Sequence, residues 1–158
     1  MTVFLEGSLD ATQVRVALVV SRFNDQVTER LLAGALTCLD RLEQPAGERT
    51  VLRVPGAWEL PLAASHAARS GRVDAVVALG ALIRGATPHF DHIATQASAG
   101  LAAVARETGI PVGFGLLTTE TVEQALDRAG GKVGNKGAEA AASAVEMVQL
   151  LRRMAQGG

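Results

Sequence analysis

Short apolar runs alternate along this chain with longer stretches in which apolar residues recur every three or four positions. The short runs have the length and continuity of strands that are buried on both faces of a sheet. They lie at 14–20, 49–54, 73–83 and 111–117. The longer stretches predict amphipathic helices, because their spacing places the apolar side chains on one face. They lie at about 24–44, 60–69, 89–108, 120–128 and 138–154.

The alternation of strands and helices predicts an α/β protein, a three-layer αβα sandwich with a four-stranded parallel sheet. Right-handed crossovers between parallel strands place helices on both faces of such a sheet. We expect the flavodoxin-like strand order 2-1-3-4. The segment 2–5 could add a short N-terminal edge strand. A chain of 158 residues with no linker-like stretch predicts one domain over 1–158.

Residues that cap helices follow several of the expected strands. Asn24 or Asp25 suits the start of the first helix, Thr87 the third and the pair 118–119 the fourth. Pro61 fits the first turn of the second helix, where its missing N–H leaves no hydrogen bond unmade.

Three candidate functional residues fall in loops that leave the carboxyl ends of strands, where open α/β sheets bind ligands. Phe23 could plug its loop onto the core or stack on a flat heterocycle. Glu59, beside the only tryptophan, could accept hydrogen bonds from sugar-like hydroxyls or complement the dipole of a helix. His89 can exchange protons near neutral pH. We expect these three side chains to converge.

The turn between the third strand and its helix has the composition of an anion site. Gly85 lets the backbone approach a ligand closely. Free amides at the start of the following helix can hold a phosphate.

Composition excludes several classes of protein. A net charge of −1 and an aromatic content of 3% argue against nucleic acid as a partner. The longest uncharged apolar run, 75–83, is far shorter than the roughly 20 residues that cross a bilayer. The first residues lack the pattern of a secretory signal, so we expect a cytoplasmic protein without membrane contacts. A hydrophobic content of 48% hints at faces that are buried between subunits.

Metal and nucleotide motifs are incomplete. The single cysteine, Cys38, excludes an internal disulfide and suits core packing. His89 and His92, with Asp91 between them, lack a third metal ligand, so we predict no metal. The glycine-rich stretches match neither a Walker A loop, since Lys136 is followed by glycine, nor a dinucleotide fingerprint.

Five motifs follow one another along the chain. They are S-R-F-N at 21–24, P-G-A-W-E-L-P at 55–61, G-A-L-I-R-G-A-T-P-H-F-D at 80–91, F-G-L-L-T-T-E at 114–120 and D-R-A-G-G-K-V-G-N-K-G at 127–137. Together they resemble the lumazine synthase family over about 3–154.

The resemblance implies a transferase of riboflavin biosynthesis that works without a cofactor or metal. Family members condense 5-amino-6-(D-ribitylamino)uracil with 3,4-dihydroxy-2-butanone 4-phosphate to 6,7-dimethyl-8-ribityllumazine, and release phosphate and water. His89 would be the general acid/base. The pyrimidine and ribityl chain would be bound by Phe23, Asn24, Ala57, Trp58, Glu59, Ala81, Leu82, Ile83, Phe114 and Lys136. The phosphate would be bound by Gly85, Ala86, Thr87 and Arg128.

The resemblance also implies a homo-oligomer. Phe114, Arg128 and Lys136 would reach the active site of an adjacent subunit in a pentamer. The short segment between Arg128 and Lys136 resembles members that assemble pentamers into an icosahedral capsid, so we expect a 60-mer.

Two alternatives remain open at the level of sequence. One is an archaeal-type riboflavin synthase, which shares the fold. The other is a shell protein that binds lumazine or flavin with little catalysis.

Overall fold

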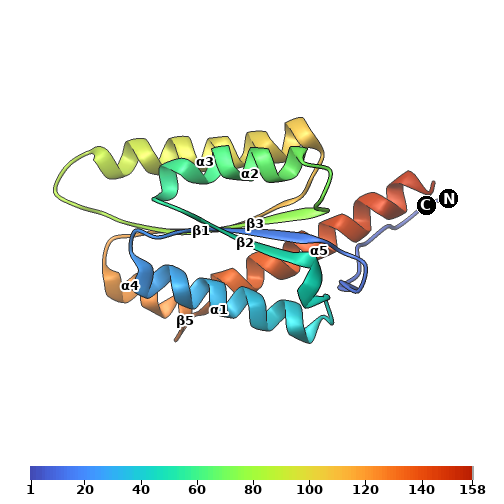
Figure 1. Ribbon diagram of the computed structural model, residues 1–158, viewed down its shortest axis with the longest axis horizontal. Helices are drawn as coiled ribbons and strands as arrows, with labels where there is room; N and C mark the ends of the chain where they lie inside the picture. Colours follow the sequence, from blue (N-terminus) through green and yellow to red (C-terminus); the bar gives the residue numbers. More distant parts are fainter. Residues whose placement is uncertain (158) are drawn as a thin grey trace.

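A four-stranded, fully parallel sheet lies between two layers of helices in the computed structural model, which describes residues 1–157 (Figure 1). The strand order β2-β1-β3-β4 confirms the predicted order 2-1-3-4. The strands are β1 Val16–Ser21, β2 Arg49–Val54, β3 Ala75–Ile83 and β4 Val112–Thr119. The αβα architecture is therefore as predicted.

Helices cover both faces of the sheet. On one face lie α2 Leu60–Arg69 and α3 His89–Thr108; on the other lie α1 Asp25–Arg41, α4 Val122–Asp127 and α5 Lys136–Ala155 (Figure 1). Two 3-10 turns, η1 Ala46–Glu48 and η2 Ala57–Glu59, flank β2. A small antiparallel hairpin of β5 Ala129–Gly131 and β6 Gly134–Asn135 precedes α5.

The central strands are apolar throughout because each face of the sheet has its own core. Val16, Leu18 and Val20 of β1 pack in the cluster that includes α1 and α5, whereas Ala17 and Val19 pack in the cluster that includes α2 and α3. All of these side chains are buried. A strand that is buried on both faces does not alternate between apolar and polar residues. A continuous apolar run in the sequence therefore predicts such a strand.

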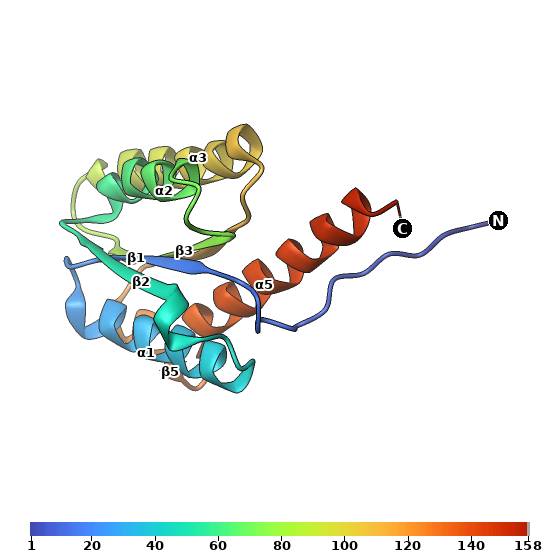
Figure 2. The ribbon, with the colours of Figure 1, turned by 45° about the vertical axis from the view of Figure 1, so that its right-hand side comes forward.

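Residues 2–5 do not form the predicted edge strand. Val3 is 67% and Phe4 85% exposed, and the segment extends beside the C-terminal half of α5, away from the sheet (Figure 2). Side chains of α5 hold the neighbouring backbone: Arg153 donates to the carbonyl of Glu6 at 2.9 Å and Gln149 to that of Asp10 at 2.6 Å. These contacts direct the segment along the helix, so it pairs with neither edge of its own sheet.

One predicted cap is confirmed in position and two differ. Asn24 occupies the cap position of α1, in the left-handed conformation with φ of 64°, but its side chain makes no cap hydrogen bond. Pro88, and not Thr87, occupies the cap position of α3. The cap of α4 is Thr121, whose hydroxyl accepts from the amide of Gln124 at 3.1 Å, so 118–119 belong to β4 instead.

Two other local predictions are confirmed. Pro61 lies in the first turn of α2. Cys38 is half-buried against the core beside α1 and α5, and burial raises the pKa of its thiol, which disfavours the reactive thiolate. The last helix begins two residues earlier than 138, because the side chain of Asn135 accepts hydrogen bonds from two amides of its first turn.

Candidate functional site

A cavity of about 440 Å³ opens at the carboxyl ends of β1, β2 and β3. The loops that follow these strands and the first turns of α3 supply its walls. Ten residues singled out from the sequence line it: Phe23, Asn24, Ala57, Trp58, Glu59, Leu82, Ile83, Gly85, Thr87 and His89. Phe23, Glu59 and His89 therefore share one cavity, although 36 and 30 residues separate them along the chain.

The loop after β1 turns the ring of Phe23 outward. The amide of Phe23 donates to the carbonyl of Pro55 at 3.0 Å, which joins the loops after β1 and β2. The side chain of Asn24 donates to the carbonyl of Ala81 at 2.9 Å, which joins the first loop to β3. Phe23 is 70% exposed, so its ring does not plug the core and is available as a wall of the cavity.

The loop after β2 brings a carboxylate to the cavity. Gly56 accepts a hydrogen bond from the amide of Glu59 at 3.2 Å, and this turn forms η2. One carboxylate oxygen of Glu59, Oε2, is buried and has no hydrogen-bond partner among residues 1–157. A buried carboxylate oxygen without a donor is costly, and a ligand hydroxyl or N–H would relieve that cost.

The loop after β3 is exposed and carries free amides. Within the described chain, the amides of Gly85, Ala86 and Thr87 donate to no backbone carbonyl. Pro88 then starts α3, and the exposed side chain of His89 lies in the first turn of this helix. Free amides that adjoin the positive end of a helix favour an anion.

Arg84 lies between β3 and this loop and contacts two acidic residues. Its guanidinium donates to both carboxylate oxygens of Asp91, at 3.2 and 3.3 Å, and its Nε lies 3.0 Å from the carboxylate of Glu120. The guanidinium carbon lies 4.5 Å from the ring centroid of Phe90. The hydrogen bonds that Arg84 donates to Asp91, and then to Glu120, raise its pKa above the ordinary value.

Four residues that line the cavity were missed at the level of sequence: Pro55, Gly56, Phe90 and Ile93. Pro55 and Gly56 belong to the same loop as Glu59. Ile93 lies four residues after His89, so helical spacing from His89 could have identified it. Phe90 directly follows His89, and helical spacing from His89 does not identify it.

Five predicted site residues do not line this cavity. Ala81 is buried in β3, and Ala86 is exposed at the tip of the loop after β3. Arg128 follows α4 and donates to the carbonyl of Gln124 at 3.0 Å. Phe114 and Lys136 line a different depression.

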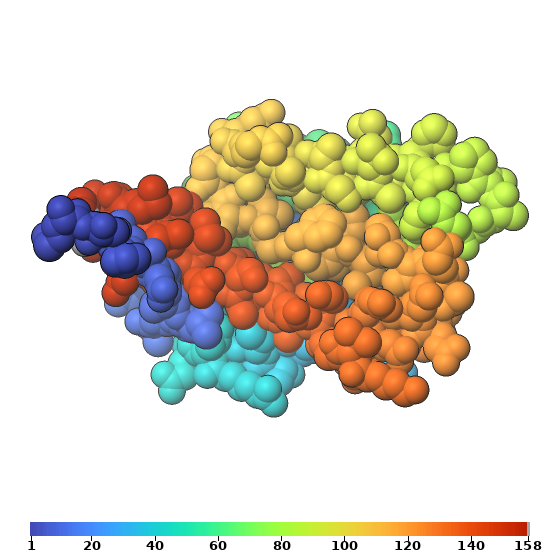
Figure 3. Space-filling view, turned by 180° about the vertical axis from the view of Figure 1, so that it is seen from behind, coloured from blue at the N-terminus to red at the C-terminus, as the bar shows by residue number. Residues whose placement is uncertain are grey.

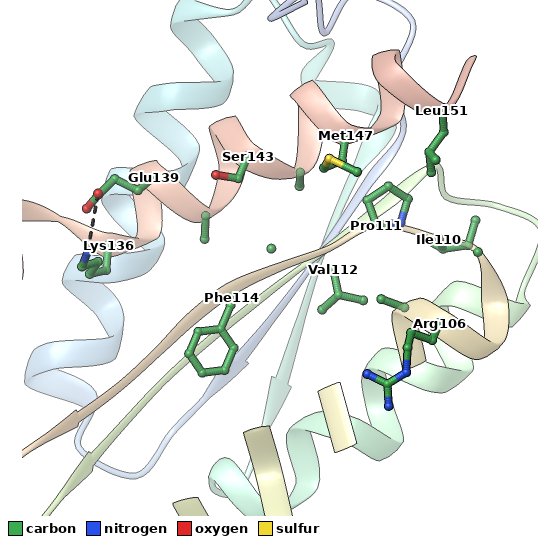
Figure 4. A pocket seen from close by; sticks show the side chains of 15 residues that line it. Arg106, Ile110, Pro111, Val112, Phe114, Lys136, Glu139, Ser143, Met147 and Leu151 are labelled. Carbon is green, nitrogen blue, oxygen red and sulfur yellow. Dashed lines mark ion pairs between the residues drawn. The ribbon is translucent and has the colours of Figure 1, made fainter. Parts of the chain in front are cut away.

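That second depression is an apolar groove of about 660 Å³ between β4, the end of α3 and α5 (Figure 4). Phe114 is 52% exposed in it, and Lys136 pairs with Glu139 at 3.5 Å. In Figure 3 the surface of β4 is visible between the yellow α3 and the red α5. A single chain thus presents its predicted site residues at two separate places.

The described residues provide no cluster of three or more His, Cys, Asp or Glu side chains that could hold a metal ion. His92 is exposed on α3. Among the helices of residues 1–157, none combines the length and apolar character needed to cross a membrane.

An open parallel sheet with a cavity at its carboxyl edge defines an α/β protein of the doubly wound class, in which this edge binds the ligand. The family model described as 6,7-dimethyl-8-ribityllumazine synthase matches residues 13–152. The chain belongs to this family.

Curated relatives agree with the family model. A protein of Chlorobium phaeobacteroides named 6,7-dimethyl-8-ribityllumazine synthase is 57% identical over 149 residues, which cover 94% of this chain and 96% of the relative. A protein of Nitratidesulfovibrio vulgaris with the same name is 51% identical over 150 residues, 95% of this chain and 96% of the relative. The resemblance inferred from the motifs is thereby confirmed over nearly the whole chain.

Proposed function

We propose that this protein is a transferase that condenses 5-amino-6-(D-ribitylamino)uracil with 3,4-dihydroxy-2-butanone 4-phosphate to 6,7-dimethyl-8-ribityllumazine. Phosphate and water are the other products. Family membership supports the reaction. The observation that carries the proposal is that an exposed aromatic ring, an unpartnered carboxylate oxygen and a histidine share one cavity.

The pyrimidine and its ribityl chain occupy the side of the cavity made by the first two loops. Phe23 stacks on the flat ring, which its exposure of 70% allows. Oε2 of Glu59 accepts a hydrogen bond from a ribityl hydroxyl, which supplies the donor that this buried oxygen lacks. Asn24 and the backbone of 57–58 and 81–83 contact the ring edge and the chain.

The phosphate of the second substrate binds at the loop after β3. The amides of Gly85, Ala86 and Thr87 are free of backbone acceptors and adjoin the start of α3. Arg128 adds a charge-assisted donor from an adjacent subunit, because in its own chain it lies beyond the cavity lining.

His89 transfers protons. The aromatic amine of the pyrimidine substrate is already a nucleophile, so the protein mainly has to hold the two substrates together, which can supply several kcal/mol of the barrier. Attack on the ketone gives a carbinolamine, and loss of water from it gives an imine. Phosphate is then eliminated, which leaves a second carbonyl in the four-carbon unit, and the ribitylamino nitrogen attacks that carbonyl with loss of a second water to close the ring. His89 lines the cavity beside the phosphate loop, where an imidazole with a pKa near 6.5 can give and take these protons.

The active site is shared between subunits of a pentamer in this proposal. Phe114 and Lys136, exposed in and beside the apolar groove, would complete the cavity of a neighbour. The short segment between Arg128 and Lys136, which forms the β5–β6 hairpin, resembles family members that form shells, and it supports assembly of the pentamers into an icosahedral 60-mer. We place the enzyme in the cytoplasm, with small-molecule substrates and copies of itself as its partners.

A direct assay tests the function. EDTA-treated protein is mixed with both substrates, and lumazine absorbance and free phosphate are followed against a protein-free control. The control is essential because the substrates also condense slowly without a catalyst. We expect saturable acceleration with one phosphate released per lumazine. Binding of a ribityl ligand without acceleration would contradict the proposal.

The two alternatives are less well supported. The relatives named above carry the name of the synthase, so neither an archaeal-type riboflavin synthase nor a weakly catalytic binding shell is favoured. Formation of riboflavin from lumazine alone would identify the first, and binding without turnover the second.

A further inference from the structure

The loop that carries the candidate phosphate site is held at its ends and not along its length. Residues 85–88 are all exposed, and the amides of Gly85, Ala86 and Thr87 donate to no backbone carbonyl within residues 1–157. On one side β3 ends, where the amide of Arg84 donates to the carbonyl of Thr119 at 2.8 Å. On the other side α3 begins at His89. Without a further contact, this loop would be free to change shape.

The side chain of Arg84 supplies that contact. It spans the loop to reach Asp91 in the first turn of α3, seven residues further on, with two hydrogen bonds of 3.2 and 3.3 Å. It reaches Glu120, just after β4, at 3.0 Å, and it lies over the ring of Phe90 at 4.5 Å. We call Arg84, Phe90, Asp91 and Glu120 the Arg84 clasp. It joins the end of β3, the end of β4 and the start of α3.

The charges around Arg84 bear on whether its guanidinium can bind a substrate phosphate. Its one positive charge faces two carboxylates, Asp91 and Glu120, so the cluster has a formal charge of −1 at neutral pH. Arg84 also does not line the cavity, whereas Phe90, on which it stacks, does. A guanidinium that is already paired twice and lies outside the cavity is poorly placed to bind a substrate phosphate.

We infer that Arg84 is a positioning residue, which sets the shape of the loop 85–88 and the position of His89 through the clasp and does not itself bind the phosphate. The inference rests on the function proposed above. The planar fork of arginine suits this role, because it can bridge two carboxylates and stack on a ring at once, whereas the ammonium of lysine cannot.

The first test removes the fork. In Arg84→Gln we expect the KM for the phosphorylated substrate to rise and kcat to fall, each by about tenfold, since small misplacements of reacting groups are costly. The KM for the pyrimidine should change less than about twofold, because Phe23 and Glu59 contact it through other loops. Arg84→Lys should recover only part of the loss. Arg69→Gln is the matched control, since Arg69 pairs with Glu107 at the opposite end of α3.

The second test separates positioning from direct binding. Asp91→Asn opens the clasp but frees Arg84. If Arg84 positions the loop, Asp91→Asn should raise the KM for the phosphorylated substrate, as Arg84→Gln does. If Arg84 were itself the phosphate ligand, freeing it would lower that KM, and the inference would be overturned.

A third measurement does not depend on turnover. Hydrogen–deuterium exchange of peptides that cover 84–95 should be faster in Arg84→Gln and in Asp91→Asn than in the wild type, and unchanged in Arg69→Gln. Exchange equal to the wild type in both variants overturns the inference even if the enzyme is active. If the wild type shows no turnover but exchange is still faster in both variants than in the wild type, the clasp is supported while the proposed function fails.

Discussion

Some side chains around the cavity are held in place by hydrogen bonds to residues that are distant in sequence. Asn24 is the clearest case, because its side-chain amide donates to the carbonyl of Ala81 in β3 and makes no hydrogen bond to the helix that Asn24 precedes. Its φ of 64° is a conformation that asparagine tolerates better than most residues with a side chain. The residue thereby fixes how the loop that carries Phe23 meets the central strand.

His89 and His92 offer a controlled comparison on one helix. Both are exposed in the first turn of α3, but only His89 lines the cavity. We predict that His89→Ala slows turnover by about ten- to a thousandfold, in line with the usual contribution of acid–base catalysis. His92→Ala should retain wild-type turnover. Steady-state kinetics of the two variants, with correction for the uncatalysed reaction, decides whether His89 takes part.

Asp74 should make stability depend on acid. Burial raises the pKa of its carboxyl, but hydrogen bonds from the side chain and backbone of Arg15, with the charges of Arg15 and Arg152, outweigh burial and lower it overall. A lowered folded-state pKa stabilises the protein above the unfolded value of about 3.9, and this contribution is lost as pH falls through the folded-state pKa.

Asp74→Asn tests this dependence. The Asp74 side chain is 20% exposed, so we expect a loss of about 1 to 2 kcal/mol in the free energy of unfolding at pH 7. The difference from the wild type should shrink below about pH 4. Denaturant unfolding at both pH values and one protein concentration measures it. An equal difference at both pH values would contradict the pKa direction.

At the scale of elements, the sequence predicted those helices and strands whose own residues carry a clear apolar pattern. The strands β1 and β3 are apolar on both faces, so continuous apolar runs in the sequence predicted them. The strand order was then inferred from the alternation of strands and helices. The cap of α3 could not be assigned in this way, because Thr87 and Pro88 are adjacent and both suit a helix start. Residues 2–5 have the composition of a strand, but their position depends on contacts with α5.

The close approach of β4 and α5 depends on a glycine. A Cβ atom added at Gly113 would lie 2.3 Å from the carbonyl oxygen of Ala140, which is backbone and cannot turn aside. We predict that Gly113→Ala costs about 1 to 3 kcal/mol of stability, as overpacking of a tight core does. Gly47→Ala is the control, since a Cβ there meets nothing within 4 Å. Thermal or denaturant unfolding of both variants measures the cost.

At the scale of the whole molecule, the candidate site is divided. The cavity gathers the residues of three loops, whereas Phe114 and Lys136 lie at the groove between β4 and α5. The two places do not meet within one chain. The expectation that an adjacent copy joins them comes from the resemblance to the family and stays a prediction about assembly.

Complementation between defective subunits tests the shared site. If Arg128 serves a neighbour's cavity, a site that takes His89 from an Arg128→Ala chain and Arg128 from an adjacent His89→Ala chain carries neither defect. We predict that co-assembled particles of the two variants recover a substantial fraction of the activity, whereas either variant alone remains impaired. Mixed particles no more active than the sum of the separate variants would argue for sites built within one chain.

The course of α5 has a practical consequence for handling the protein. This helix and the segment 1–10 run out side by side from the end of the sheet that lies opposite the cavity loops (Figures 1 and 2). A fluorescent label or an affinity tag joined ahead of residue 1 would be tethered away from the cavity of the same chain. This position is therefore a natural point for attaching a single copy to a support.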